Sequence, residues 1–274
     1  MYRLHYQTDG TLEGLLTAIS EAQIRGEDPV NILIDPENQE SLFDSHIPIL
    51  TDPGKAEELR TQIIQRLTEY GYDKVKKLYL AEDSNRGGVA LRYLRYTLKH
   101  GQHSLGHLAQ QAVADAEDII KQVEKEAHFM IQFIRFAEIQ PDIKGTVLLC
   151  LESDSQHQLS TGTRHKRTVP FMSSGLYYAH IQPKARVLPL IMGHFAARYN
   201  IQPFIIHDSR HSMAGLFDTQ RWWLVADDTL RLPVDADGLS SLAEDGYQDL
   251  WRTFYRTLTI PERRNPTSQR NVMP

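Results

Sequence analysis

Apolar residues recur at helical spacing through most of the first half of the chain. The first such stretch begins after Thr11, a suitable N-cap, and stops at Gly26. A second begins at Asp52-Pro53, a cap followed by a first-turn proline, and ends at Gly71. The other predicted elements here are helices over Lys74–Ala81, Gly88–His100 and roughly Leu108–Phe136, and short strands over Tyr2–Gln7 and Val30–Ile34, with mostly loop over 35–54. Residues 1–139 therefore read as a mainly helical N-terminal region.

Strand-like apolar runs alternate with turns in the C-terminal part of the chain. They cover Leu176–Ile181, Phe204–His207, Met213–Phe217 and Trp222–Val225. The intervening predictions are an amphipathic helix over Leu188–Tyr199, a hairpin turn over Asp218–Arg221 and a closing helix over Leu239–Leu258. The pattern predicts an α+β fold with a helix-rich N-terminal half. Residues 175–274 are expected to form a small antiparallel sheet packed by helices, followed by a tail rich in arginine and aromatic residues.

Residues 140–174 differ from both flanking regions. They hold one strand-like run, Thr146–Leu151, and then a polar, turn-rich stretch that leads into the basic cluster Arg164–Arg167. Ordering such a stretch would bury little apolar surface against the entropy that it costs. We therefore predict a mobile insertion at 140–174, with residues 152–170 dispensable for folding.

Charge is unevenly distributed along the chain. The 274 residues contain 30 Lys and Arg against 35 Asp and Glu, so the formal net charge is −5 and a uniformly basic nucleic-acid wrapper is excluded. From residue 151 onward 14 basic residues stand against 12 acidic ones, whereas the first 150 residues hold 16 against 23. An anionic ligand is therefore expected to meet the C-terminal half.

The single cysteine, Cys150, excludes intramolecular disulfides and every two-cysteine metal site. No apolar run approaches the length of a membrane span, and the residues after Met1 lack the apolar core of a signal peptide. These features predict a soluble, cytoplasmic protein with no membrane partner. Neither a Walker loop nor a G-x-S-x-G nucleophile motif is present.

The C-terminal segment interleaves arginines with aromatic and amide side chains. Arg252 and Arg256 are four residues apart and share a helical face, with Tyr255 beside them. The arginines that follow are Arg263, Arg264 and Arg270. Guanidinium groups among aromatic rings suit phosphate contact and base stacking, so these five arginines are the predicted nucleic-acid-binding residues. The alternative is a packed helix whose arginines pair with neighbouring acids such as Asp249 and Glu262.

Two stripes run along the predicted helix near residue 130. The apolar one, typical of a core face, comprises Phe129, Phe133 and Phe136. The polar one comprises His128, Gln132 and Arg135. A histidine, an amide and an arginine on one face suit a phosphate or a base edge, so His128 and Arg135 are further candidates for ligand contact.

Histidines and an aspartate gather around the predicted C-terminal strands: His180, His194, His207, Asp208 and His211. Their spacing matches no standard ligand pattern, and strand neighbours such as His207 and Asp208 point to opposite faces, so we predict no metal site and no cofactor. We expect a helix end and a strand end to bring four side chains into one cleft: His194, Arg198, Asp208 and Arg210. The candidate catalytic residues are His194, Asp208 and His180. A salt bridge from Asp208 to Arg198 or Arg210 is the structural alternative.

Another group of histidines, His100, His103 and His107, follows a basic stripe on the preceding helix. Gly101 and Gly106 interrupt the helix that would align the imidazoles, and no H-E-x-x-H motif is present. The stripe itself consists of Arg92, Arg95 and Lys99. A solvated helix face is the default interpretation of such a stripe.

Five collinear stretches resemble a family of bacterial proteins of DNA metabolism or DNA repair whose conserved region is a domain of unknown function. The stretches span nearly the whole chain and are Tyr6–Ala22, Glu126–Phe136, Gly175–Pro183, Val187–Arg198 and Leu250–Pro274. Members of that family tend to occur with a radical-SAM protein associated with DNA modification or repair, and some are fused to a uracil-DNA glycosylase-like domain. The resemblance implies a DNA-repair context and a radical-SAM partner. It supplies no reaction, catalytic residue or cofactor.

Two features depart from that family. Residues 140–174 read as an insertion, because members pass almost directly from the Phe133–Phe136 stretch to the one that begins at Gly175. Members also continue past the equivalent of Met273-Pro274 into a basic, aromatic tail that this sequence lacks. The difference lowers the nucleic-acid affinity expected of this chain alone.

Three functions follow as hypotheses. The first is an accessory protein of DNA metabolism or repair that binds DNA or RNA and a radical-SAM partner. The second is an enzyme that processes a nucleobase or a phosphodiester with a His/Asp cleft. The third is a structural adaptor without nucleic-acid contact, which the net charge of −5 favours.

Overall fold

The computed structural model describes residues 3–34, 44–139 and 176–226, and these residues divide between two compact units. Unit 1 consists of Met1–Glu126 together with the short segment Lys184–Arg186. Unit 2 consists of Ala127–Pro183 and Val187–Pro274. The predicted insertion at 140–174 and the C-terminal segment from 227 onward lie outside the described residues.

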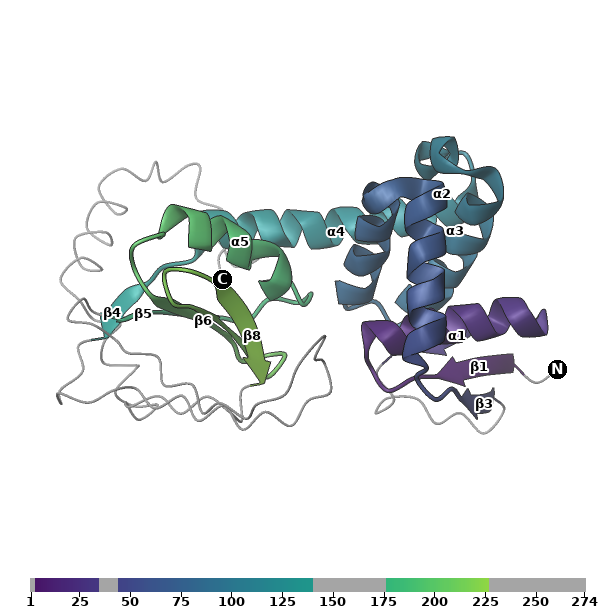
Figure 1. Ribbon diagram of the computed structural model, residues 1–274, viewed down its shortest axis with the longest axis horizontal. Helices are drawn as coiled ribbons and strands as arrows, with labels where there is room; N and C mark the ends of the chain where they lie inside the picture. Colours follow the sequence, from purple (N-terminus) through teal and green to yellow (C-terminus); the bar gives the residue numbers. More distant parts are fainter. Residues whose placement is uncertain (1–2, 35–43, 140–175, 227–274) are drawn as a thin grey trace, which may run out of the picture. The chain divides into compact units, whose positions relative to one another are not determined.

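Unit 1 contains a small sheet in which every pairing is parallel (Figure 1). Its strands, in the order β2-β1-β3, are β1 Arg3–Gln7, β2 Asn31–Leu33 and β3 Asp44–Pro48. Strand β3 lies where the sequence predicted mostly loop, so that prediction is wrong for these residues. Asp44–Pro48 has no alternation of apolar residues, and its strand conformation depends on the ladder with β1, which local sequence does not encode.

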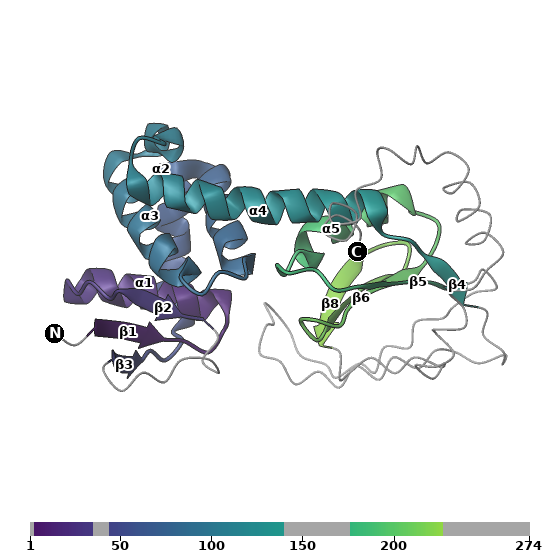
Figure 2. The same ribbon diagram turned by 180° about the vertical axis from the view of Figure 1, so that it is seen from behind.

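Helix α1, Leu12–Arg25, covers one face of this sheet (Figure 2). The Oγ1 of Thr11 accepts a hydrogen bond from the backbone N–H of Gly14 at 2.9 Å. Gly26 ends the helix in the left-handed region at φ 65°, where a residue without Cβ meets no steric penalty. Both predicted helix ends are confirmed.

Helix α2, Pro53–Leu80, begins at the predicted cap, where Asp52 Oδ1 accepts hydrogen bonds from Gly54 N and Lys55 N at 2.9 and 3.2 Å. The helix does not end at Gly71 as predicted. It bends instead at Thr68, whose φ of 68° breaks the helical geometry. Gly71 is buried against Leu67, so its small size serves packing rather than termination.

Helix α3, Arg86–His100, starts directly against strand β2. The Asn31 side chain holds this junction, accepting a hydrogen bond from Gly88 N at 2.8 Å and donating one to Ser84 O at 2.7 Å. A Cβ on Gly87 would overlap the Ile32 carbonyl and lie 2.9 Å from the Ile32 Cβ. The glycine pair therefore permits a close approach of helix and strand. After α3 come the 3₁₀ helix η2, Gln102–Gly106, and helix α4, Gln111–Phe133.

The segment Lys184–Arg186 belongs to unit 1 although the chain around it belongs to unit 2. The carboxylate of Glu126 accepts hydrogen bonds from the backbone N–H groups of Lys184 and Ala185 at 2.6 and 2.8 Å. Arg186 N donates to the carbonyl of Leu80 at 2.9 Å. These hydrogen bonds attach residues 184–186 to the second half of α4 and to the C-terminal end of α2.

Unit 2 is built on a five-stranded sheet in the order β4-β5-β6-β7-β8. The strands are β4 Ala137–Ile139, β5 Leu176–Ile181, β6 Phe204–Asp208, β7 Met213–Phe217 and β8 Trp222–Ala226. The predicted α+β class is confirmed. The sheet is mixed rather than purely antiparallel, because β5 and β6 are parallel and joined through helix α5, Leu188–Arg198. A parallel pair requires such a crossover.

Helix α5 lies over one face of this sheet (Figure 1). Met192 occupies the space that a Cβ on Gly215 would fill, so helix and strand β7 approach closely. At the other end of the helix the ring of Phe136 packs edge-on against Phe195 and Phe204, with centroids 5.4 Å away in each case. The half-buried Phe136 thus adds to the buried aromatic pair Phe195 and Phe204 in the unit 2 core.

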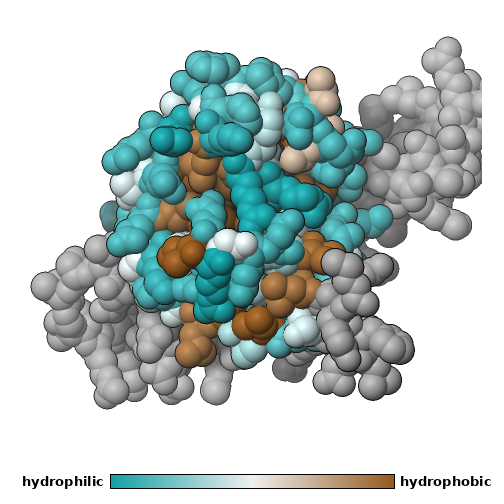
Figure 3. Space-filling view, turned by 90° about the vertical axis from the view of Figure 1, so that its right-hand side faces the viewer, coloured by the Kyte–Doolittle hydropathy of each residue, from teal (hydrophilic) through white to brown (hydrophobic). Residues whose placement is uncertain are grey.

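One face of the molecule is shown coloured by hydropathy in Figure 3. Hydrophilic residues cover most of the face seen in Figure 3, and apolar residues emerge in smaller areas between them. No helix within the described ranges has the length and apolar content to cross a bilayer.

Candidate functional site

A polar cluster lies on strands β5 and β6 of unit 2. The parallel register pairs His180 with His207 and Tyr178 with Ile205, so the side chains of Tyr178, His180 and His207 share one face of the sheet. Tyr178 Oη is hydrogen-bonded to His207 Nδ1 at 2.8 Å, and the His180 and His207 rings meet edge-on at 5.6 Å. Strand register alone thus assembles a phenol and two imidazoles.

The cluster continues to the surface beyond the strand ends. His180 Nε2 is hydrogen-bonded to Ser209 Oγ at 2.7 Å, and Gln182 Nε2 donates to the same oxygen at 3.1 Å. Tyr178 is buried, His207 and Ser209 are half-buried, and His180 and Gln182 are exposed. We call these five residues the β5–β6 polar cluster. It leads from the sheet interior to a solvent-facing end, and none of its members is acidic.

Asp208 points to the opposite face from His207, as the sequence predicted. It is fully buried, and its Oδ2 accepts a hydrogen bond from His211 Nδ1 at 2.7 Å. Its Oδ1 accepts from the backbone N–H groups of Arg210 and His211 at 3.2 and 3.3 Å. These contacts fix the turn between β6 and β7. Within the part of the chain that the structure describes, the carboxylate is thus engaged in supporting the turn.

We expect Asp208→Ala to lower the free energy of unfolding by about 2 kcal/mol, because the half-buried His211 imidazole and two turn N–H groups lose their acceptor. Asp208→Asn should recover part of the loss, since its amide oxygen still accepts. Asp218 accepts backbone hydrogen bonds from Gln220 and Arg221 in the β7–β8 turn without full burial, and Asp218→Ala is the matched control at about 1 kcal/mol. Urea denaturation of the full chain measures all three. Equal losses for Asp208→Ala and Asp218→Ala would contradict the burial argument.

His194 and Arg198 lie on the exposed side of helix α5, whereas Asp208 is fully buried. The residues of α5 that are buried are Leu188, Ile191, Met192 and Phe195. His194 and Arg198 are exposed on the other side of the helix, and Arg198 lies 5.8 Å from the centroid of the Tyr199 ring. Arg210 is exposed in the β6–β7 turn. The structure therefore does not bring the four residues of the expected cleft together, because a buried aspartate and two outward-facing helix residues do not meet.

The polar stripe at the end of α4 forms in part. His128 and Gln132 are hydrogen-bonded through their Nε2 atoms at 2.8 Å, and both are exposed. The helix ends at Phe133 rather than at Phe136, so exposed Arg135 lies beyond it. Phe136 also lies beyond the end of the helix, and its ring packs against Phe195 and Phe204 instead of extending the apolar stripe of α4. Ligand contact by His128 and Arg135 stays a prediction.

The five predicted nucleic-acid-binding arginines lie outside the described residues: Arg252, Arg256, Arg263, Arg264 and Arg270.

Tyr178, Gln182 and Ser209 are members of the β5–β6 polar cluster that the sequence analysis did not predict. The signal for Tyr178 was the order strand, helix, strand over 176–208, which is the pattern of a parallel β-α-β unit. In such a unit alternate residues of the two strands share a face. That signal would have placed Tyr178 beside His180 and His207.

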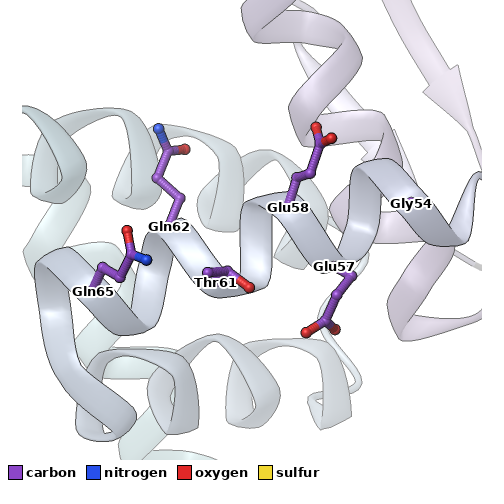
Figure 4. Close-up of a pocket in the computed structure, with 6 residues that line it drawn as sticks. All are labelled: Gly54, Glu57, Glu58, Thr61, Gln62 and Gln65. Carbon is purple, nitrogen blue, oxygen red and sulfur yellow. The ribbon is translucent and has the colours of Figure 1, made fainter.

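The described surface has a hollow of about 410 Å³ along helix α2 (Figure 4). Its lining residues are Gly54, Glu57, Glu58, Thr61, Gln62 and Gln65. All six come from one helix, so a ligand would find no opposing wall among the described residues.

Among the described residues no group of three His, Cys, Asp or Glu side chains is arranged to hold a metal ion.

Fold and site together define a class: an α+β protein of two units, the second of which carries a histidine-rich polar cluster on a mixed sheet. The chain belongs to the DUF4130 family, a domain of unknown function, whose family model matches residues 84–160 and 152–274. The match takes in α3, α4 and the sheet strands of unit 2 from β4 to β8. Comparison with curated proteins and with solved structures found no match.

Proposed function

We propose that this chain is an accessory protein of DNA metabolism or repair that binds nucleic acid through unit 2 and acts with a radical-SAM enzyme. The observation that carries the proposal is the β5–β6 polar cluster, with Arg210 exposed in the adjoining turn. The net positive charge of residues 151–274 and the family resemblance support it.

The chemistry of the cluster suits an anion with hydrogen-bonding edges. Imidazole, amide, hydroxyl and phenol groups all donate hydrogen bonds to phosphate oxygens or base edges. At the exposed end of the cluster His180 and Gln182 converge on Ser209, so a ligand there meets several donors at once. Asp208, the acid between His207 and Ser209 in sequence, is buried on the opposite face and hydrogen-bonded to His211, so its carboxylate does not contact a ligand at the cluster.

The test is fluorescence anisotropy of labelled single-stranded DNA, duplex DNA and RNA across a salt titration. Wild type is expected to bind weakly, with little sequence preference and with affinity that falls steeply as salt rises. The double variant His180→Ala/Gln182→Ala should weaken binding about tenfold through the loss of two donors. His194→Ala is the matched control, because it removes an exposed imidazole outside the cluster and should change nothing. No detectable binding by wild type at low salt would remove the proposal.

The C-terminal arginines enter the same assay. Replacing both Arg263 and Arg264 by Ala should reduce the slope of log affinity against log salt by about 1.5 to 2 if both contact phosphate. An unchanged slope together with a lower melting temperature would assign them instead to ion pairs with neighbours such as Glu262.

The radical-SAM partner is tested by co-expression and co-purification with the radical-SAM protein of the same genome. Separate elution of the two proteins would count against that partner.

A second function has one observation in its favour. The His180–Ser209 hydrogen bond joins an imidazole to a hydroxyl, which is the pairing that activates serine nucleophiles. An enzyme acting on a phosphodiester or a nucleobase would use it. In that case Ser209→Ala abolishes turnover of a nucleic-acid substrate while binding persists. An accessory protein has no turnover to lose.

A further inference from the structure

Helix α3 and η2 lie in a stretch without acidic residues. Residues 84–114 contain no aspartate or glutamate, although the first 150 residues carry 23 acids against 16 basic residues. The basic and imidazole side chains of this stretch are Arg86, Arg92, Arg95, Lys99, His100, His103 and His107. A basic stretch of sequence is therefore set into an acidic half of the chain.

Two of these cations are already engaged. Arg86 is buried and donates to the Asp83 carbonyl at 3.3 Å. Arg95 forms an ion pair with Asp28. Arg92 and Lys99 are exposed and seven residues apart, so they lie on one face of α3, and no ion pair engages either within the described part of the chain. Their charges remain open to an external anion.

Aromatic rings lie between and beside these charges. Tyr96 is four residues from Arg92 and shares its face. Its ring contacts His100 at a centroid distance of 4.2 Å, and the Nδ1 of His100 is held at 2.8 Å from the Tyr96 carbonyl. On the other side Tyr96 Oη is hydrogen-bonded to His107 Nδ1 at 3.3 Å. Three rings thus form a row on the surface, and both imidazoles are exposed.

We propose that this α3 face, formed by Arg92, Tyr96, Lys99, His100 and His107, binds single-stranded nucleic acid, with the cations on phosphates and the ring row stacked against unpaired bases. The inference rests on the proposed function and adds to it a contact surface in unit 1. Cations attract a phosphate backbone without regard to sequence, and rings add stacking that only unpaired bases satisfy.

The experiment measures binding of fluorescein-labelled oligothymidylate to the full chain across a salt titration. Arg92→Ala/Lys99→Ala should reduce the slope of log affinity against log salt by about 1.4, because each phosphate neutralised on a single strand contributes roughly 0.7. Lys76→Ala/Lys121→Ala removes the same charge elsewhere in unit 1 and should leave the slope unchanged. Tyr96→Ala should weaken binding about tenfold without a change of slope, whereas Tyr96→Phe keeps the ring and the affinity.

The outcomes separate this inference from the proposed function. If Arg92→Ala/Lys99→Ala binds like wild type while His180→Ala/Gln182→Ala is weakened, the α3 face is not a binding surface and the proposed function stands. If wild type fails to bind any nucleic acid at low salt, both are overturned. Two further outcomes would overturn the single-strand inference: equal affinity for duplex and single-stranded DNA, or a loss of slope in the Lys76/Lys121 double variant as large as that in the Arg92/Lys99 variant. Either would show that the chain attracts nucleic acid through general charge. Thermal melts of each variant establish that folding is intact.

Discussion

Gly87→Ala is expected to destabilise the protein by at least about 3 kcal/mol. The added methyl would overlap the backbone carbonyl of Ile32 and lie 2.9 Å from its Cβ, and neither atom has a flexible end that moves aside. To admit it, α3 must move away from β2, which breaks the hydrogen bonds of the Asn31 side chain with Gly88 and Ser84. Urea denaturation of the full chain, followed by far-UV circular dichroism, measures the loss.

Gly106→Ala is the matched control for this substitution. Gly106 lies at the end of η2, where an added Cβ meets nothing within 4 Å, so the change should stay within about 1 kcal/mol. Gly215→Ala falls between the two, because the atoms that it meets belong to the flexible Met192 side chain. A Gly87→Ala protein as stable as the Gly106→Ala protein would show that α3 and β2 are not in close contact.

Glu117→Ala should cost about 3 kcal/mol, because it leaves a buried ammonium group without its partner. Lys74 on α2 has a side chain only 6% exposed and forms an ion pair with Glu117 on α4, whose side chain is 14% exposed. Burial lowers the pKa of Lys74, which reports the cost of keeping a charge at this position. The double variant Lys74→Met/Glu117→Leu should restore most of the stability, because apolar side chains of similar size need no desolvation.

The exposed pair Arg60–Glu57 provides the comparison for the buried one. Its side chains are 39% and 61% exposed, so Glu57→Ala should change stability by no more than about 0.5 kcal/mol. A double-mutant cycle at Lys74 and Glu117 measures the coupling directly. If Glu117→Ala and Glu57→Ala cost the same, the Lys74–Glu117 pair is not buried in solution.

Elements with their own end signals could be predicted from the sequence. Helix α1 has a hydroxyl cap at Thr11 and a left-handed glycine at Gly26, and its bounds follow from those two residues. Strand β3 has no such signal, since its conformation comes from pairing with β1. The bend of α2 at Thr68 could not be predicted either. Glycine commonly ends a helix, which favoured Gly71 as the end, but in the structure Gly71 lies inside α2 and packs against Leu67.

The candidate site was predictable only as far as strand periodicity reaches. Alternation placed His207 and Asp208 on opposite faces of β6, and the structure has them so. Which strand lies next to β6, and in which direction, depends on the crossover through α5. The prediction of an antiparallel sheet therefore could not pair His207 with His180, because that pairing requires β5 and β6 to be parallel. The expected cleft joined His194 and Arg198 to Asp208 because a helix end and the following strand end can meet, but the buried face of α5 turns both helix residues outward.

The fastening of Lys184–Arg186 to unit 1 bears on how the chain is made. A ribosome delivers residues from the N-terminus, and Lys184 follows Glu126 by 58 positions. When α4 emerges, the Glu126 carboxylate and the Leu80 carbonyl have yet to receive the backbone donors that they hold in the finished protein. Those donors arrive only after β4 and β5 have been synthesised. Unit 1 therefore cannot form its hydrogen bonds to Lys184, Ala185 and Arg186 until the ribosome has synthesised β5 of unit 2 and the residues that follow it.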